Sequence, residues 1–367
     1  MQKLCIVYNF AQLYREQIFK LIDQEWKCIW RFGKPEDGIK DMDISQLHDS
    51  EIIETIKFPG GWKWQKGIVG LLRNNEIDSF LMLGELFNLS TWAMLLLRPI
   101  LARKKKIYFW SHGWYGREGF LKKWMKRIFF GLADKTFLYG NYAREIAIKQ
   151  GNCPAKLIVL HNSLDFDNQS KLRNCINPSD IFANYFQNNN PTLIFIGRLT
   201  KIKKLHQIIE AVALLKNRGE NYNIVFVGDG TERKYLEDVA KHMKVPIWFY
   251  GSCYDDTVNA ELIYNADLCV APGNVGLTAM HTMAFGTPVL THDNFSNQMP
   301  EFEAIVDGKT GAFFKEDNID SLAEAISDWF NVHQKDREIV RKDCVFEIAS
   351  YWCPSFQIKI LKKNINL

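Results

Sequence analysis

The segment Leu268–Thr291, LCVAPGNVGLTAMHTMAFGTPVLT, is the clearest indication of the fold of this chain. Its first four residues are apolar and predict a buried strand, and Pro288–Thr291 predicts a second one. Between them, a loop containing Gly273 and Gly276 leads into a helical pattern that stops at Gly286. A strand, a glycine-rich loop, a helix and a second strand in this order are typical of a parallel α/β sheet.

The same alternation of short apolar runs and longer helical patterns extends over nearly the whole chain. Strands are predicted at Leu4–Tyr8, Cys28–Trp30, Phe80–Leu83, Ile107–Ser111, Thr136–Tyr139 and Leu157–Leu160, and again at Leu193–Ile196, Ile224–Val227 and Ile247–Tyr250. Two such halves predict the fold class, α/β with two Rossmann-like domains. We expect an N-terminal domain at 1–165, a linker at 166–191, a C-terminal domain at 192–345, and a final helix at 346–367 that packs back on the first domain.

The composition is that of a globular protein without a long disordered tail. Of 367 residues, 47% are hydrophobic and 24% are charged, and the small net charge of +4 does not by itself indicate nucleic-acid binding. The eight cysteines include no CxxC pair, so we expect neither a disulfide framework nor a structural zinc site. The N-terminus lacks a signal-peptide pattern, and Phe80–Leu101, the most apolar region, is interrupted by Glu85 and Arg98. We therefore expect a cytoplasmic protein.

Unusual residues follow the strands of the second half, where ligands of parallel sheets bind. The strand end at Gly197 is followed by Arg198 and Lys203, a planar fork of donors and a mobile point charge that together suit a diphosphate. A solvated basic turn is the alternative interpretation. Gly228 and Gly251 follow the next two strands, and the absence of a side chain there leaves room for a ligand.

Five motifs of this half resemble, in their order and spacing, the nucleotide-sugar-binding half of GT-B glycosyltransferases of group 1, the retaining family 4. They are GRL at Gly197–Leu199 with Lys203, VGDGTER at Val227–Arg233, YNAD at Tyr264–Asp267, MAFGTPV at Met283–Val289 and DGKTG at Asp307–Gly311. The resemblance covers Leu193 to about Trp329. It implies two Rossmann-like domains whose parallel sheets face each other across a cleft.

The resemblance also implies a reaction and a role for the residues at the strand ends. A hexosyltransferase of this type moves a sugar, with retention, from a nucleotide-diphosphate sugar to a polysaccharide or lipid-linked acceptor in cell-surface glycan synthesis. Arg198 and Lys203 would hold the diphosphate and stabilise its developing charge. The amides of Gly276, Leu277 and Thr278 would bind the same phosphates at the start of a helix. No cofactor is expected besides the donor substrate.

Two residues depart from this family. Its members usually carry two glutamates eight positions apart, and these positions fall on Gly273 and His281. We expect a ring nitrogen of His281 to bind the ribose hydroxyls in place of the second glutamate. Gly273 has no side chain with which to contact the donor sugar, so the donor sugar and nucleobase stay unassigned. A catalytically inactive scaffold or regulatory subunit is therefore the alternative to an active enzyme.

His112 is the candidate catalytic residue of the first half. It follows the strand Ile107–Ser111, and family members carry a histidine in a similar place near the reacting carbon. The resemblance implies that His112 positions the acceptor or accepts its proton, a role suited to the pKa of imidazole. A histidine that merely caps the strand is the alternative. The loop Asn9–Arg15 replaces the paired glycines of the family, which leaves Tyr14 and Arg15 unassigned.

The region from Arg98 to Phe130 is basic and aromatic. We expect Arg103–Phe130 to offer a peripheral contact to the inner face of the plasma membrane, where tryptophan and phenylalanine enter the interface and lysines meet anionic lipid. Such a contact would suit a lipid-linked acceptor. The alternative is an ordinary amphipathic helix with Phe129 and Phe130 in the core.

Two aspartate pairs require a check, because metal-dependent glycosyltransferases of another fold use a DxD motif. Asp41 with Asp43, and Asp165 with Asp167, fit this pattern, but we interpret both as chance and predict no catalytic metal. A sugar-nucleotide epimerase on the same fold fits the motifs less well. A dehydrogenase fits worse still, because no GxGxxG follows the first strand.

Overall fold

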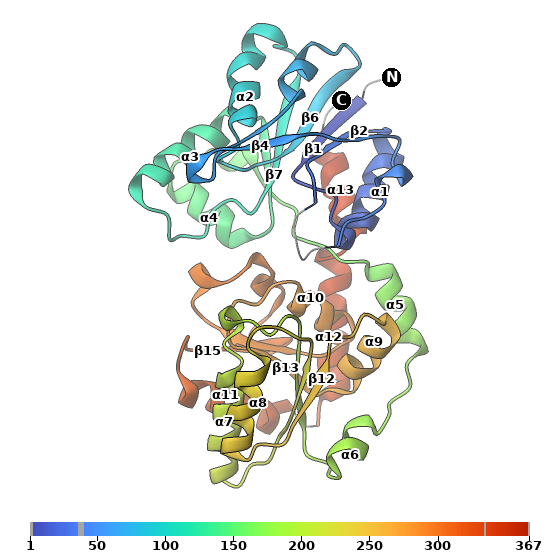
Figure 1. Cartoon of the computed structure of the whole chain (residues 1–367), viewed down its shortest axis with the longest axis vertical. Coiled ribbons are helices and arrows are strands. Elements are labelled where there is room, and N and C mark those ends of the chain that lie inside the picture. The colour runs from blue at the N-terminus through green and yellow to red at the C-terminus, as the bar shows by residue number, and fades with distance from the viewer. Residues whose placement is uncertain (1–2, 36–39, 334, 366–367) are drawn as a thin grey trace. The chain divides into compact units, whose positions relative to one another are not determined.

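The computed structural model describes residues 3–35, 40–333 and 335–365. The chain divides into two compact units, the first made of residues 1–165 and 353–367 and the second of residues 166–352. Each unit is built on its own parallel sheet, and helices cover both faces of that sheet (Figure 1). No helix among the described residues is long and apolar enough to cross a membrane.

The described residues of the first unit form a seven-stranded parallel sheet. Its order is β3 (Asp49–Ile52), β2 (Ile29–Phe32), β1 (Lys3–Tyr8), β6 (Ile77–Leu83), β7 (Lys106–Ser111), β8 (Lys135–Leu138) and β9 (Leu157–Val159). A separate antiparallel hairpin is formed by β4 (Thr55–Lys57) and β5 (Lys63–Gln65). The order reverses between β1 and β6, which makes the carboxyl end of these strands the expected ligand-binding edge.

The central strands of the first sheet are buried on both faces because successive side chains alternate between two apolar cores. Cys5 and Val7 of β1 enter one core, while Ile6 and Tyr8 enter the other. The first core is closed by α2 (Leu89–Leu101), α3 (Phe120–Leu132) and α4 (Asn141–Lys149). The second is closed by α1 (Glu16–Trp26) and α13 (Pro354–Asn364), so the end of the chain packs beside its beginning (Figure 1).

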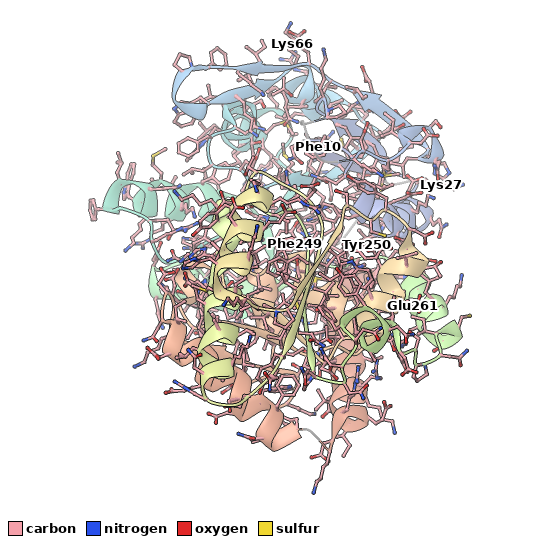
Figure 2. The ribbon with its side chains drawn as sticks, turned by 60° about the horizontal axis from the view of Figure 1, so that its bottom comes forward. Phe10, Lys27, Lys66, Phe249, Tyr250 and Glu261 are labelled. Carbon is pink, nitrogen blue, oxygen red and sulfur yellow. The ribbon has the colours of Figure 1, made fainter. Side chains whose placement is uncertain are left out.

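The described residues of the second unit form a six-stranded parallel sheet. Its order is β12 (Ile247–Gly251), β11 (Asn223–Val227), β10 (Thr192–Ile196), β13 (Leu268–Ala271), β14 (Val289–His292) and β15 (Gly311–Phe314). Phe249 and Tyr250 lie on β12 at the edge of this sheet (Figure 2). The strand order reverses between β10 and β13, a switch point at which doubly wound sheets bind ligands.

Eight α-helices are described in the second unit. They are α5 (Phe166–Cys175), α6 (Ile181–Phe186), α7 (His206–Asn217), α8 (Arg233–Met243), α9 (Asp256–Asn265), α10 (Leu277–Ala284), α11 (Ile319–His333) and α12 (Arg337–Tyr351). The segment 166–191, expected as a linker, supplies α5 and α6 and packs on α9 and α10 of this unit. The last unit boundary lies at 352/353, between α12 and α13, rather than at 345/346.

Candidate functional site

Three glycines mark the carboxyl ends of β10, β11 and β12 in the second unit. Gly197 and Gly228 have a φ of 145° and Gly251 has a φ of 91°, values that side chains disfavour. The amide of Gly197 donates to the carbonyl of Val227 (2.9 Å), and the amide of Gly228 donates to the carbonyl of Gly251 (2.8 Å). A Cβ on Gly228 would lie 1.9 Å from the Gly197 oxygen. The three strand ends therefore meet through backbone alone.

Lys203 lies in the turn after β10 and points at the glycine-rich loop after β13. Its Nζ donates to the carbonyl oxygen of Asn274 (2.7 Å) and to the Oδ1 of Asn274 (3.0 Å). Burial lowers the pKa of Lys203, Glu301 acts in the opposite direction, and the positive charge of Arg198 lowers the pKa as well. Lys203 is thus a largely buried cation held by neutral oxygens and close enough to Arg198 to feel its charge.

Arg198 is the exposed member of this pair of cations. Within the described part of the chain, no hydrogen bond or ion pair engages its guanidinium. Its positive charge lowers the pKa of Lys203, so the two cations are close enough to interact. An anion placed there would gain a planar fork of donors from Arg198 and a desolvated charge from Lys203.

Lys204, the next residue, forms ion pairs instead of contacting the glycine-rich loop. Its Nζ forms ion pairs with Glu316 (3.0 Å) and Asp317 (2.7 Å). Its φ of 51° is left-handed, so the chain turns sharply between the two lysines. The ion pairs of Lys204 anchor the turn, while Lys203 stays directed at Asn274.

The loop between β13 and α10 packs against this turn without any intervening side chain. The amide of Gly273 donates to the carbonyl of Lys203 (3.0 Å), and a Cβ on Gly273 would lie 2.0 Å from the oxygen of Ile202. The buried Gln298 accepts from the amide of Val275 (2.7 Å). Glycine is therefore required at 273 for the two loops to approach this closely.

Helix α10 begins at Leu277 with an uncapped first turn. Its N-cap is Gly276, and no side chain accepts a hydrogen bond from the first turn. The hydroxyl of Thr278 donates instead to the carbonyl of Ile196 at the end of β10 (3.1 Å), which ties the helix start to the strand that precedes Arg198. First-turn amides lack intrahelical acceptors, and the helix dipole favours an anion beside them.

His281 lies further along α10, and its Nδ1 lies 3.1 Å from the Nε2 of Gln169 on α5. Burial lowers the pKa of His281 to about 4, against a smaller opposite effect of Asp256. The ring is therefore neutral at physiological pH. It can accept or donate a hydrogen bond, but it does not supply the negative charge of a glutamate.

His112, the predicted catalytic residue, belongs to the first unit and not to this cluster. It follows the central strand β7, with its ring centroid 4.6 Å from that of Tyr139. Burial, followed by the nearby charge of Arg15, lowers the pKa of His112 to about 4. Its Nδ1 is buried and has no hydrogen-bond partner. A neutral imidazole with an uncommitted nitrogen is compatible with proton acceptance.

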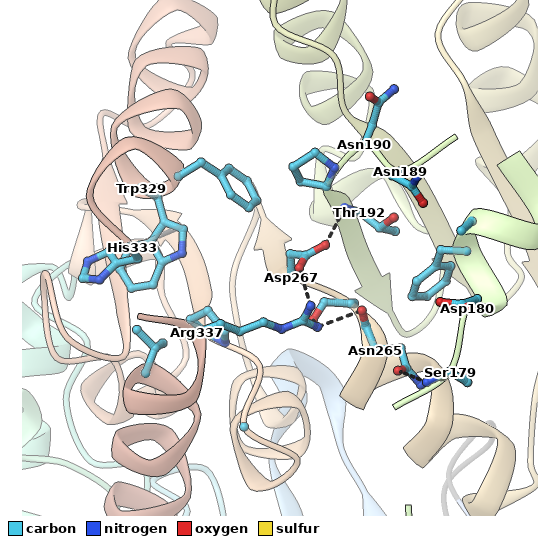
Figure 3. Close-up of a pocket in the computed structure, with 18 of the residues that line it drawn as sticks. Ser179, Asp180, Asn189, Asn190, Thr192, Asn265, Asp267, Trp329, His333 and Arg337 are labelled. Carbon is cyan, nitrogen blue, oxygen red and sulfur yellow. Dashed lines mark hydrogen bonds and ion pairs between the residues drawn. The ribbon is translucent and has the colours of Figure 1, made fainter. Parts of the chain in front are cut away.

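A cavity of about 330 Å³ lies at the opposite edge of the second sheet, where the strands begin (Figure 3). Its central groups are already paired. Arg337 forms an ion pair with Asp267 (2.8 Å), whose other oxygen accepts from the amide of Thr192 (2.8 Å). The amide of Ser179 donates to Asn265 on another wall. The first two contacts join α12 to the starts of β13 and β10, and the third joins the segment before α6 to α9. The cavity contains none of the residues predicted from the strand ends.

The aspartates of the DxD-like pairs include one with a local structural role. Asp43 accepts a hydrogen bond from the amide of Ser45 (3.0 Å) and caps a short 3-10 helix. Gln169, Asn274 and Gln298, in contrast, contribute to the site of the second unit although sequence reasoning did not single them out. Each makes a long-range contact for which the sequence offers no local signal.

Comparison with protein families supports the resemblance of the second unit to group 1 glycosyltransferases. Residues 177–343 match the model described as "Glycosyl transferases group 1". The matched segment contains β10 to β15 and the predicted donor-site residues from Gly197 to His281.

Two relatives of known description each match a part of this chain. A glycogen synthase of Mycobacterium tuberculosis is 30% identical over 138 residues, which cover 36% of this chain and 32% of the relative. A GDP-mannose-dependent alpha-(1-6)-phosphatidylinositol dimannoside mannosyltransferase of the same species is 36% identical over 101 residues, covering 27% and 26%. The chain thus matches about a third or less of the length of these two relatives.

Solved structures resemble the whole chain. The apo lipopolysaccharide outer core galactosyltransferase WaaB has a TM-score of 0.71 at 12% identity and full coverage of both chains. Anabaena Alr3699/HepE, solved in complex with UDP, has a TM-score of 0.71 at 14% identity and 99% coverage of both. The likeness confirms the predicted fold class, the GT-B arrangement of two Rossmann-like domains with parallel sheets.

Proposed function

We propose that this chain is a retaining glycosyltransferase that moves a sugar from a nucleotide-diphosphate sugar to a glycan or lipid-linked acceptor. The observation that carries the proposal is the convergence of Arg198, Lys203 and the uncapped start of α10 at the switch point of the second sheet. Two cations and a helix start directed at one region suit a diphosphate.

The proposed chemistry requires the diphosphate to leave as the glycosidic bond breaks. Negative charge then grows on the phosphate oxygens, and preorganised donors lower the barrier because they need no rearrangement at that moment. Lys203 is preorganised by Asn274, and its burial strengthens its interaction with an anion. Arg198 supplies the second charge and the amides at Gly276–Thr278 supply neutral donors.

We assign the ribose to His281. If Gln169 donates to Nδ1, the neutral ring carries its hydrogen on Nε2, which is then available to donate to a ribose hydroxyl. The complexes of HepE with UDP and with UDP-glucose support a nucleotide sugar as the class of donor.

A catalytically inactive scaffold is the second candidate, and Gly273 is the observation that favours it. The family's first glutamate would fall at this position, where a Cβ would meet the backbone of Ile202 and Lys203 at 2.0 and 2.7 Å. The position therefore serves the packing of two loops. Binding of a donor without turnover would identify such a scaffold.

We also propose that the first unit contacts a membrane surface through the beginning of α3. Phe120 is 88% exposed, Leu121 67% and Trp124 57%, and exposed Lys122 and Lys123 lie among them. Apolar side chains interspersed with lysines suit an anionic lipid interface. This would place the enzyme peripherally at the inner face of the plasma membrane, close to a lipid-linked acceptor.

Part of the predicted membrane segment has a different role. Phe129 and Phe130, at the end of α3, are 0% and 4% exposed and pack in the core against Phe109 and Trp114. They are core residues, as the alternative interpretation of this helix expected. The interfacial role is therefore assigned to the first half of α3 alone.

The test is a turnover assay with UDP-, GDP- and ADP-sugars in the absence of added metal. We expect slow release of the nucleoside diphosphate from one of these donors, because water can replace the acceptor. Arg198→Ala should lower this rate about 100- to 1,000-fold with the melting temperature unchanged, since an exposed side chain that acts on developing charge is lost. An unchanged rate in Arg198→Ala would remove this residue from the mechanism.

A further inference from the structure

Arg15 is a buried cation without a counter-ion among the described residues. Its side chain belongs to a residue that is only 3% exposed, at the end of the short 3-10 helix before α1. Its Cζ lies 5.1–5.5 Å from four ring centroids, those of Tyr8, Tyr14, Trp110 and Tyr139. We call this arrangement the Arg15 cage.

The hydrogen bonds of the guanidinium leave one nitrogen unused. Nε donates to the hydroxyl of Tyr14 (3.2 Å) and Nη2 donates to the hydroxyl of Tyr139, whereas Nη1 is buried without a partner. Each cation–π contact returns about 0.5–2 kcal/mol. Burying a charge costs several kcal/mol unless an opposite charge or a full set of hydrogen bonds compensates it. The cage therefore compensates the charge of Arg15 only in part, because it offers no opposite charge and no acceptor for Nη1.

Two further polar groups beside Arg15 are also unsatisfied. The indole nitrogen of Trp110, whose ring lies 5.1 Å from the Arg15 Cζ, is buried without an acceptor. The Nδ1 of His112 is likewise buried without a partner, and the His112 ring packs on Tyr139. An arginine nitrogen and an indole nitrogen can only donate. An acceptor close to these atoms, and with Arg15 a negatively charged one, would satisfy the two obligate donors, and His112 would add a third donor in its Nδ1–H tautomer.

The Arg15 cage lies at the edge of the first sheet where ligands are expected. Tyr8 is the last residue of β1, Trp110 is near the end of β7, and Tyr139 follows β8 directly. These are the carboxyl ends of neighbouring or nearby strands in the order β1, β6, β7, β8. Tyr14 is the partly exposed member of the cage, so the cage borders solvent on the side of this ring.

We propose that Arg15, with Trp110 and His112, binds an anionic group of the acceptor, a phosphate or a carboxylate. This inference rests on the proposed function, which makes the first unit the acceptor side. The donor diphosphate is assigned to Arg198 and Lys203 in the second unit, which leaves a separate anion for Arg15. The acceptor is thus an acidic sugar or a sugar phosphate rather than a neutral glycan.

The test follows the ring signals of His112 by nuclear magnetic resonance in the full chain labelled at histidine. The His112 signals are identified by their absence in His112→Gln. Inorganic phosphate and glucuronate are the charged probes, glucose is the neutral match for glucuronate, and UDP is the probe for the donor. We expect a saturable shift with phosphate, glucuronate or both, and no shift with glucose.

Three variants connect the shift to the cage. Arg15→Met should weaken the binding of the anion at least tenfold, because it removes a charge-assisted hydrogen bond. Arg15→Lys keeps the charge, should retain part of the affinity, and serves if Arg15→Met does not fold. Arg31 lies on β2 and pairs with Asp49 and Glu51 of β3. Arg31→Met is the control and should leave the shift unchanged.

The outcomes separate the possibilities. A shift with phosphate alone indicates a phosphorylated acceptor, and one with glucuronate alone indicates a uronic acid. No saturable shift with either anion, or equal affinity in wild type and both Arg15 variants, would overturn the proposal. A shift with UDP only would assign the cage to the donor and overturn it as well. A chain that shows the Arg15-dependent shift but no turnover would refute the proposed enzyme and retain the anion site.

Discussion

The carboxyl edges of the two sheets present positive charge in different ways. In the second unit, strand ends at Gly197, Gly228 and Gly251 carry no side chains, and the backbone itself comes close to the ligand region. In the first unit, the corresponding edge is filled by the aromatic rings around Arg15. One edge is built from backbone and two cations, the other from packed side chains.

This difference matters for the kind of ligand that each edge can serve. A glycine-lined edge with a helix start can bind any diphosphate, because backbone amides and charge are its only requirements. A closed aromatic cage around one arginine has a defined size and is selective. On the function proposed above, the second unit would bind the donor diphosphate and the first would select the acceptor.

The largest effect on nucleotide binding should distinguish two adjacent lysines of the second edge. Lys203→Met should weaken the binding of UDP, GDP or ADP about 10- to 100-fold, because a hydrogen bond to a charged group contributes about 1.5–3 kcal/mol. Lys204→Met should change the affinity less than threefold, because Lys204 pairs with Glu316 and Asp317 instead. Isothermal titration of both variants is the measurement. Equal losses would show that the turn as a whole, and not Lys203, binds the anion.

Both units should lose stability in mild acid through buried histidines. Burial lowers the pKa of His161 in the first unit and of His281 in the second to about 4. Because the unfolded chain binds more protons between pH 6.5 and 4, these groups reduce the free energy of unfolding as the pH falls through this range. Urea titrations at pH 7 and 4.5 should show a loss of about 1–3 kcal/mol per histidine.

Replacing each histidine by glutamine tests how much of the acid-induced loss of stability comes from each unit. His281→Gln and His161→Gln should each make the stability less dependent on pH. An equally steep dependence in both variants would mean that other groups cause the acid sensitivity.

The contact between the two loops of the second edge should be sensitive to a single methyl group. Gly273→Ala should destabilise the protein by about 1–3 kcal/mol, because the new Cβ would overlap the oxygen of Ile202. It should also weaken nucleotide binding by displacing Lys203. Thermal unfolding with and without nucleotide measures both effects, and a fully stable Gly273→Ala that binds normally would contradict the tight contact.

The smallest effect has the opposite sign and serves as the control for the glycine variant. Gly131 lies inside α3, where a Cβ would meet no atom within 4 Å. Gly131→Ala should therefore stabilise the protein by about 0.5–1 kcal/mol through its better helix propensity. A loss of stability in a urea titration would show that the environment of α3 differs from this description.

Sequence patterns predicted most of the fold because buried parallel strands read as continuous apolar runs. The strand β3 was missed because its sequence, DSEI, is polar and largely exposed at the edge of its sheet. The strand β15 was missed because the short run Gly311–Phe314 directly follows a turn motif. The edge strands β9 and β12, in contrast, keep apolar runs and were predicted.

The two edges differ in how far the sequence could predict them. The glycines, Arg198 and Lys203 are local features at strand ends. The partner of Lys203, in contrast, is 71 residues away, and the partner of His281 is 112 residues away. The Arg15 cage closes on Tyr139, 124 residues later in the chain. Contacts between residues so far apart in the sequence depend on the topology of the fold. A site built from such side-chain contacts is therefore harder to predict than one built from glycines at strand ends.

The most direct measurement of the central claim is amide hydrogen exchange with and without a saturating nucleoside diphosphate. If the second edge binds the donor diphosphate, exchange should slow in peptides that contain residues 197–203 and 276–278, whose first-turn amides would acquire an acceptor. Peptides around Arg15 should exchange at the same rate in both states. Protection around Arg15 without protection at 276–278 would contradict the assignment of the donor to the second unit.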